Sequence, residues 1–235
     1  MMLTVHTAAL LAAQSSTFSQ KLTAVFTQLS VGLLTTLEIF VLTLALSLPL
    51  GLLVSFGRMS KIGILRWVVK IYISIMRGTP LMLQLMVVYF GPYYIFHINI
   101  SSEYRFVAVV IGFVLNYAAY FAEIYRGGIE SMPAGQYEAA QVLGFSRQQT
   151  FMRIILPQVF KRIMPPVTNE VITLVKDTSL AMVISVSEMF TNAQALASAQ
   201  VSVIPLVVAG IFYYIMNYVV AWGMELIEKR MNYYR

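Results

Sequence analysis

Long apolar stretches separated by short polar ones are the dominant pattern along this chain. A membrane-spanning helix needs roughly 20 mainly apolar residues. Five stretches approach or exceed that length: Val31–Phe56, Leu81–Phe96, Phe106–Tyr125, Ile163–Val186 and Ile204–Ile227. The second is short unless it begins further back. The pattern predicts an all-α integral membrane protein, a helical bundle with about five transmembrane helices.

Residues 1–30 precede the first of these stretches. They contain an apolar run, but no basic residue stands before it, so they do not resemble a cleaved signal peptide. We expect residues 1–30 to form an extracellular or interfacial lead-in and residues 31–232 to form the transmembrane domain.

The stretch "ILRWVVKIYISIMR", residues 64–77, is amphipathic at helical spacing. One narrow face holds Arg66, Lys70, Ser74 and Arg77. This pattern predicts a helix that lies in the cytoplasmic interface of the membrane. Gly78 and Pro80 then break the helix, and Pro80 suits the first turn of the next one. One long, tilted helix with a kink is an alternative that the pattern leaves open.

Composition supports a membrane protein and limits its chemistry. Of the 235 residues, 59% are hydrophobic and 11% are charged, whereas a soluble domain usually carries about 25% charged residues. The chain has no cysteine, which excludes a disulfide, a thiolate metal site and a cysteine nucleophile. Because no metal-ligand cluster or Ser/His/Asp set lies at one predicted membrane depth, we expect no catalytic residue and no metal site.

Lys and Arg are distributed unevenly between the two sides of the predicted bundle. Thirteen of the 16 lie in the connections after the first and third apolar stretches and in the C-terminal tail, and only Lys21 and Arg105 lie on the other side. The positive-inside rule then places the N-terminus outside and the C-terminus in the cytoplasm. The net charge of +6 therefore reflects topology and does not indicate nucleic-acid binding.

Polar side chains interrupt two of the apolar stretches. A charge at the bilayer centre costs on the order of 2.5–3.5 kcal/mol, so such residues face the bundle interior or water. Overlapping faces of the fourth stretch hold Asn169, Glu170, Thr173, Lys176 and Asp177. One face of the third stretch holds Gly112, Asn116, Tyr120 and Glu123. We predict that these two stripes face each other and a polar pathway.

The alternative is that these side chains only join helices to one another. That choice stays open for Asn116, Thr173, Lys176 and Asp177. A functional role is favoured for Glu170, because no cation lies one turn away in its own helix. Glu123 precedes Arg126 at a spacing of three, which predicts a surface ion pair and not a ligand contact.

The segment 127–160 is polar and, by the predicted orientation, cytoplasmic. "QYEAAQVL" predicts a short helix that Gly144 ends. "SRQQTFMRIIL" predicts a second short helix, with Ser146 and Gln149 in a capping box and Pro157 closing or kinking it. The small side chains of Ala139 and Ala140 in the first helix leave a surface that another protein can approach. Charged residues, Glu138 and Arg153, lie at its edge.

The stretch "EAAQVLGFSRQQTFMRIILP" fits the pattern E-A-A, three residues, G, nine residues, I-x-L-P. It resembles the cytoplasmic EAA loop of the membrane subunits of bacterial ATP-binding-cassette (ABC) importers. "YRGGIESMPAGQYEAA", "MRGTPLMLQL" and "NEVITLVKDTSLA" are similar to the polar amino-acid permeases of that superfamily. The resemblance covers roughly residues 30–232.

The resemblance implies the MetI-like permease fold of type I importers, in the bacterial plasma (inner) membrane. It implies that coupling helices within residues 135–158 dock on a separate ATPase dimer through Glu138, Ala139, Ala140 and Gly144, and we expect Arg153 at the edge of that contact. It also implies a second permease subunit, identical or homologous, and an extracellular or periplasmic amino-acid-binding protein. ATP and Mg would bind to the partner ATPase, with no cofactor in this chain.

The sequence contains no G-x-x-x-x-G-K-[ST] motif, so it lacks that device for holding ATP phosphates. We therefore expect a transport subunit that is not itself an enzyme. A secondary amino-acid carrier driven by an ion gradient is the alternative, although the inverted repeats common in carriers are not visible.

For the substrate we expect a site within the polar stripes. Glu170 is predicted to bind the ammonium group or a cationic side chain of an amino acid. Neutral hydrogen bonds are expected from Asn116, Tyr120, Asn169 and Thr173. Thr79 and the backbone N–H groups after the "RGTP" break are expected to meet the carboxylate. The residues leave open whether the substrate is cystine, glutamine, a basic amino acid or another.

Overall fold

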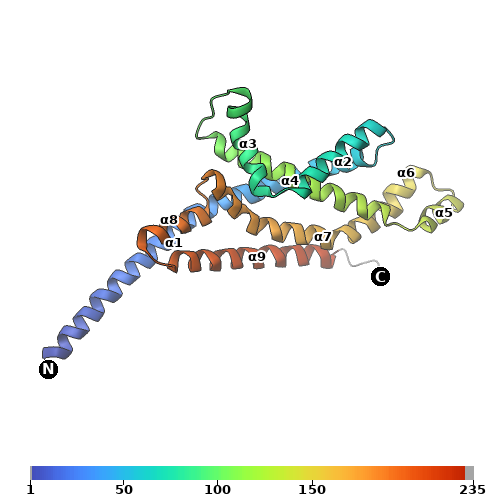
Figure 1. Ribbon diagram of the computed structural model, residues 1–235. Coiled ribbons are helices and arrows are strands. Elements are labelled where there is room, and N and C mark those ends of the chain that lie inside the picture. Colours follow the sequence, from blue (N-terminus) through green and yellow to red (C-terminus); the bar gives the residue numbers. More distant parts are fainter. Residues whose placement is uncertain (1, 231–235) are drawn as a thin grey trace.

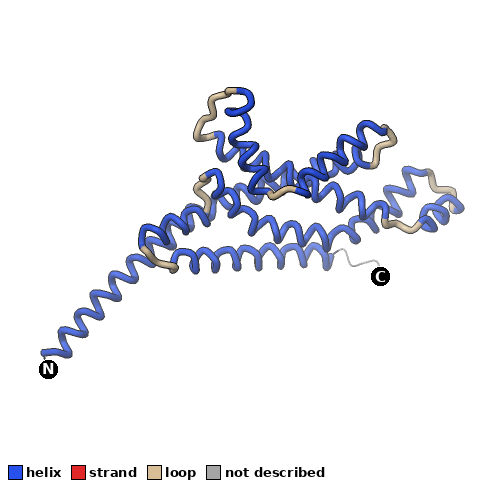
Figure 2. The backbone as a smooth tube through the Cα atoms, viewed as in Figure 1, coloured by secondary structure: helices blue, strands red, loops and turns tan. Residues whose placement is uncertain are grey.

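The computed structural model describes the backbone of residues 2–230 and the side chains from Ser19 onward. Within this range every regular element is helical and no strand occurs, which confirms the all-α prediction (Figure 2). The α-helices are α1 (Met2–Arg58), α2 (Gly63–Gly78), α3 (Leu81–Phe96), α4 (Tyr104–Glu130), α5 (Ala134–Val142), α6 (Arg147–Thr150), α7 (Leu156–Asp177), α8 (Met189–Gln200) and α9 (Ile204–Arg230). A π-helical segment, η1 (Phe151–Ile155), and a 3₁₀-helix, η2 (Thr178–Ile184), complete the set.

Helix α4 is the centre of the bundle and packs against α1, α2, α3 and α7. The main core cluster draws on all the long helices, with Ile39 from α1, Phe113 from α4, Leu174 from α7 and Met216 from α9. At Gly51 of α1 an added Cβ would stand 2.8 Å from the Cβ of Phe121. The absence of a side chain there lets α1 and α4 approach closely, as is common between membrane helices.

A second core cluster holds α8 against α1 and α9. It consists of Val25, Leu29, Met189, Ala193, Val208 and Ala209. Figure 1 shows α8 beside α1, near the part of α1 that projects from the bundle. Helix α8 has no counterpart among the predicted elements, because its residues are too few and too mixed in polarity to form a membrane-spanning pattern.

Among the residues that the structure describes, three helical segments are long and apolar enough to cross a membrane: Ser19–Arg58 in α1, Tyr104–Glu130 and Ile204–Arg230. The bent pair α2 and α3 counts as a fourth if it forms one span. Helix α7 is not among them, because it carries several charged residues, and its α-helix ends at Asp177, before the predicted end at Val186. The predicted number of five spans, and the division at residue 30, therefore stay predictions.

Helices α2 and α3 form a corner with a bend of 112° beside the middle of α4 (Figure 1). The Tyr72 hydroxyl of α2 donates a hydrogen bond to the Leu115 carbonyl in mid-α4. The Tyr104 hydroxyl, at the start of α4, donates to the Val88 carbonyl of α3, at 3.1 Å. The two short helices thus accompany different halves of α4. A bend of 112° does not fit one long, tilted helix with a kink, and the position of α2 in the cytoplasmic interface stays a prediction.

Candidate functional site

The predicted coupling loop forms a corner at the end of the bundle opposite the N-terminus (Figure 1). Gly144 ends α5 with a φ of 78°, in the left-handed region. Its N–H donates to the Gln141 carbonyl at 3.0 Å, and the Phe145 N–H donates to the Ala140 carbonyl at 3.0 Å. This pair of bonds is the Schellman motif, which favours glycine at this position. The prediction that Gly144 ends the first helix is confirmed.

The second arm of the corner begins with the predicted capping box. The Gln149 N–H donates to Ser146 Oγ at 3.3 Å, and the Ser146 N–H donates to Gln149 Oε1 at 2.9 Å. Of the two outcomes predicted at Pro157, closure of the helix is wrong, because helical backbone continues through η1 into α7. Pro157 lacks an N–H, and the wider π-helical turn before it lets the chain continue without a break.

Most of the predicted coupling residues lie on the surface. Glu138, Ala139, Gly144 and Arg153 are exposed, whereas Ala140 is buried. Within the described residues Glu138 forms neither a hydrogen bond nor an ion pair, so it does not pair with Arg153. Beside the corner is a pocket of about 560 Å³ lined by Tyr137, Gln141, Phe145, Ser146, Arg147, Thr150 and Phe151. The arrangement offers a surface for another protein.

The "RGTP" break is held by a network of side-chain amides. Asn116 Nδ2 donates to the Met76 carbonyl at 3.0 Å and to Gln84 Oε1 at 2.9 Å. Gln84 Nε2 donates to the Met76 carbonyl at 2.9 Å and to Thr79 Oγ1 at 2.8 Å. These bonds satisfy carbonyls that the end of α2 leaves unpaired. Both N–H groups of Asn116 are therefore used in fixing the corner.

The stripe of the third apolar stretch faces this corner and not α7. Gly112 packs against Leu85 of α3, and the Tyr120 ring lies under the Arg77 guanidinium, 5.2 Å from Cζ to the ring centroid. The prediction that the two polar stripes face each other is wrong. Sequence spacing gives the residues that share a helix face, but the rotation of the helix depends on its neighbours.

Contact between α4 and the polar face of α7 is made by a neighbouring residue, Tyr117. Its hydroxyl donates to Asp177 Oδ2 at 2.7 Å. Lys176 is exposed and lines a different pocket, with Ser179 and Tyr213, between α7 and α9. Asp177 thus joins α7 to α4, whereas Lys176, the residue before it, points into a different pocket and does not pair with Asp177.

Three of the predicted substrate-pathway residues have free polar groups. Asn169 is exposed, and Glu170 and Thr173 are partly exposed. None of the three side chains forms a hydrogen bond or ion pair within the part of the chain that the structure describes. Their side chains are available to a ligand or a second subunit, whereas Thr79 and Asn116 are committed to the corner.

Glu123 forms the predicted ion pair with Arg126, at 2.6 Å from Nη2 to Oε2. Two other helices also bring cations to this carboxylate. Arg58 of α1 lies at 3.7 Å and Arg77 of α2 at 4.0 Å. The pair predicted within one helix is therefore part of a larger cluster at one end of the bundle.

Glu188, which is fully buried, is a site residue that was not predicted from the sequence. Its carboxylate accepts hydrogen bonds from the N–H groups of Phe190 and Thr191, at 2.7 and 2.6 Å, and from the Tyr213 hydroxyl at 3.1 Å. An acidic residue just before a helix is a capping signal that could have found it. Glu188 caps α8 and links it to α9, which is a structural role.

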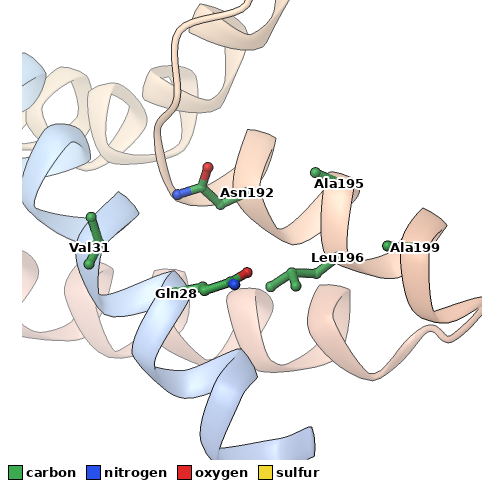
Figure 3. A pocket seen from close by; sticks show the side chains of 6 residues that line it. All are labelled: Gln28, Val31, Asn192, Ala195, Leu196 and Ala199. Carbon is green, nitrogen blue, oxygen red and sulfur yellow. The ribbon is translucent and has the colours of Figure 1, made fainter.

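Figure 3 shows a further pocket, of about 390 Å³, between α1 and α8. Two amides, Gln28 and Asn192, lie among apolar and small side chains: Val31, Ala195, Leu196 and Ala199. The lining contains no titratable group, so the pocket offers no acid–base chemistry.

Comparison with known proteins agrees with this geometry. A family model described as "Binding-protein-dependent transport system inner membrane component" matches residues 47–233. The L-cystine transport system permease protein TcyB of Bacillus subtilis (strain 168) is 38% identical over 209 residues, which cover 88% of this chain and 87% of that protein. The arginine transport system permease protein ArtQ of the same organism is 36% identical over 202 residues, covering 86% of this chain and 91% of that protein.

A chain from the crystal structure of an amino acid ABC transporter with histidines has the same fold, with a TM-score of 0.79 and 31% identity. The match covers 87% of this chain and 94% of that chain. The expected permease fold is thereby confirmed. On these matches the chain belongs to the family of inner-membrane components of binding-protein-dependent transport systems.

Proposed function

We propose that this chain is the permease subunit of an ATP-driven importer for polar amino acids. The observation that carries the proposal is the exposed corner between α5 and α6, where Glu138 lies on the surface without a partner in the described residues. A family match over residues 47–233 and similarity to amino-acid permeases support the substrate class. The relatives differ in the amino acid named, so the proposal stops at that class.

The corner would transmit movement of the ATPase to the membrane helices. A partner ATPase dimer that binds ATP and Mg would close, move α5 and α6, and shift the bundle between its two orientations. Because helical backbone runs without a break from Arg147 to Asp177, movement of the corner passes directly into α7. The free side chains of Asn169, Glu170 and Thr173 lie on that same helix. This continuity links the docking surface to the proposed pathway.

In the proposed pathway Glu170 binds the ammonium group of the amino acid, while Asn169, Tyr120 and Thr173 supply neutral contacts. The network at the "RGTP" break gives Asn116 and Thr79 a positioning role, since their polar groups already bind protein atoms. Backbone N–H groups at the start of α3 would then meet the carboxylate. A second permease subunit would cover the open polar face of α7, because polar groups are costly against lipid.

A binding protein on the outer side would deliver the amino acid, with the N-terminus outside and the coupling corner in the cytoplasm. The secondary-carrier alternative is not favoured, since the matched family comprises components of binding-protein-dependent systems. The expected membrane is the bacterial plasma (inner) membrane.

Transport by the reconstituted complex of this chain with its ATPase and binding protein tests the proposal. We expect uptake of a labelled amino acid only with ATP inside, and loss of uptake with retained ATPase assembly in Glu138→Arg. Glu228→Arg is the matched control, because Glu228 is also exposed and carries the same charge change. Uptake by the chain without any ATPase subunit would refute the proposal, as would normal coupled uptake by Glu138→Arg.

A further inference from the structure

A pocket of about 420 Å³ lies between α2, the end of α1 and the C-terminal half of α4. Its lining includes three cationic side chains, one from α1 and two from α2: Arg58, Lys70 and Arg77. Ser74, Tyr120 and Glu123 complete its polar lining. Of the residues assigned above to the substrate pathway only Tyr120 lines this pocket, and no residue of the coupling corner does.

The pocket carries more positive charge than its own carboxylate can balance. Glu123 is already bound by Arg126, through Nη2 at 2.6 Å and Nε at 3.2 Å. Arg58 and Arg77 approach the same carboxylate only at 3.7 and 4.0 Å. Within the described residues Lys70 has no ion pair at all. Arg58 and Arg77 therefore share a carboxylate that Arg126 binds more closely, Arg126 is itself shared with Glu130, and Lys70 pairs with no carboxylate of the described residues.

The cations are also arranged to meet a ligand. Lys70, Ser74 and Arg77 occupy one face of α2, so two charges and a hydroxyl line the same side of the pocket. The Arg77 guanidinium lies over the Tyr120 ring, 5.2 Å from its centroid, which orients the group. Guanidinium and ammonium groups grouped in this way suit a carboxylate or a phosphate.

The position of the pocket adds a physical reason for an anion. Ile73 of α2 packs against Ala119 and Ala122, so the pocket lies beside the part of α4 that continues toward the coupling corner. Uncompensated charges next to a membrane helix are costly and are stabilised by water or by a counter-ion. Basic pockets between helices on the cytoplasmic side of a membrane suit anionic head groups.

We propose that Arg58, Lys70, Ser74 and Arg77 form a binding site for a carboxylate or phosphate group, open to the cytoplasmic side. Two molecules supply such a group: an anionic phospholipid, and the imported amino acid as it leaves the pathway. The second source rests on the proposed function. The pocket would then bind the carboxylate of the amino acid after it leaves the site on α7 and before it reaches the cytoplasm.

The chain has two tryptophans, and one of them can report on this site. Trp67 lies on α2 one turn from Lys70, so Trp222→Phe leaves it as the single tryptophan of this chain, and the same complex with Trp67→Phe gives the background from the other subunits. The assembled complex is placed in vesicles of phosphatidylcholine containing either brominated phosphatidylglycerol or brominated phosphatidylcholine, and quenching of Trp67 is compared. In a second arm, acetate and L-glutamine are titrated in phosphatidylcholine alone.

We expect Lys70→Gln and Arg77→Gln to abolish the response, while Arg66→Gln, on the same helix but outside the pocket lining, retains it. A phosphatidylglycerol preference of about fivefold per basic residue, lost in Lys70→Gln, identifies the lipid. A saturable response to acetate and L-glutamine, lost in the same variant, identifies the carboxylate. No response in either arm, or an equal loss in Arg66→Gln, overturns the proposal. ATP-dependent uptake in these vesicles is measured in parallel, so failure of the proposed function is seen separately.

Discussion

Two acidic side chains in the second half of the chain have opposite surroundings. The Glu188 carboxylate is fully buried and its hydrogen bonds are supplied by α8 and Tyr213. Glu170 is partly exposed, and no hydrogen bond or ion pair to it is found among the residues described. A carboxylate that is satisfied within the fold stabilises it, whereas an unsatisfied one is available to a ligand. Replacing Glu170 should therefore impair transport, whereas replacing Glu188 should lower the stability of the fold.

Replacing Glu170 by Gln removes a charge but keeps the shape, so we expect loss of amino-acid uptake with an unchanged thermal midpoint. Glu188→Ala leaves buried N–H groups of Phe190 and Thr191 without an acceptor, at about 1–3 kcal/mol for each unsatisfied group. We expect a lower thermal midpoint for that variant. Uptake by the reconstituted complex and thermal unfolding of the purified chain are the two measurements.

Glu225→Gln serves as the control, because Glu225 is exposed and, among the described residues, pairs only with Lys229 on the same helix. Normal uptake by the Glu170 variant would remove that residue from the proposed pathway. An unchanged midpoint for Glu188→Ala would show that its hydrogen bonds contribute little.

The ends and breaks of the helices determine which surfaces of the bundle are exposed to partners and ligands. The Schellman motif at Gly144 turns the chain between α5 and α6. The amide network of Asn116 and Gln84 fixes the corner between α2 and α3. Ser185, with a φ of 58°, ends η2 before α8 begins. Each of these breaks is held by specific hydrogen bonds, so each can be tested by one substitution.

Gly144→Ala and Gly135→Ala form a matched pair in the coupling corner. An L-residue in the left-handed region costs roughly 1–2 kcal/mol, so alanine at position 144 should destabilise the end of α5. Gly135 lies within α5, with open space around it, and alanine there should favour the helix by about 1 kcal/mol. We expect faster amide hydrogen exchange in α5 for Gly144→Ala and slower exchange for Gly135→Ala.

Equal exchange in the two variants would show that the positive φ at Gly144 is not what ends the helix. Coupled uptake is measured beside the exchange rates, and we expect it to fall only in Gly144→Ala.

Over the whole molecule, the two ends of the bundle differ in character. The projecting part of α1 lies at one end, and α5 and α6 lie at the other (Figure 1). Basic residues concentrate toward the second end, where Arg126 pairs with Glu123 and Glu130 of α4 and Arg162 donates to the Ser131 carbonyl in the connection after α4. The positive-inside rule predicts that this end is cytoplasmic. The proposed partners on each side depend on that orientation.

Because the chain has no cysteine, one introduced cysteine reports its own location. Ser102 lies in the exposed connection between α3 and α4, and Gln148 is exposed in α6. We expect a membrane-impermeant maleimide to label Ser102→Cys in right-side-out vesicles and Gln148→Cys only in inverted ones. The reverse pattern would place the coupling corner outside and contradict an intracellular ATPase partner.

Features that depend on residues close together along the chain were predictable from the sequence. The apolar stretch Leu81–Phe96 coincides with α3, and the stretch predicted from Ile204 begins where α9 begins. The capping box of Ser146 with Gln149 and the turn at Gly144 were predictable for the same reason, since their hydrogen bonds join residues a few positions apart.

The rotation of each helix, and the polar groups that remain without a partner, depend on contacts between distant segments and follow from the fold alone. Asn116 faces the corner between α2 and α3 because carbonyls of α2 need donors there. Glu188 is buried because Tyr213, far along the chain, reaches it. A helical period gives the residues of one face, but the partner of that face is set by the packing of distant segments.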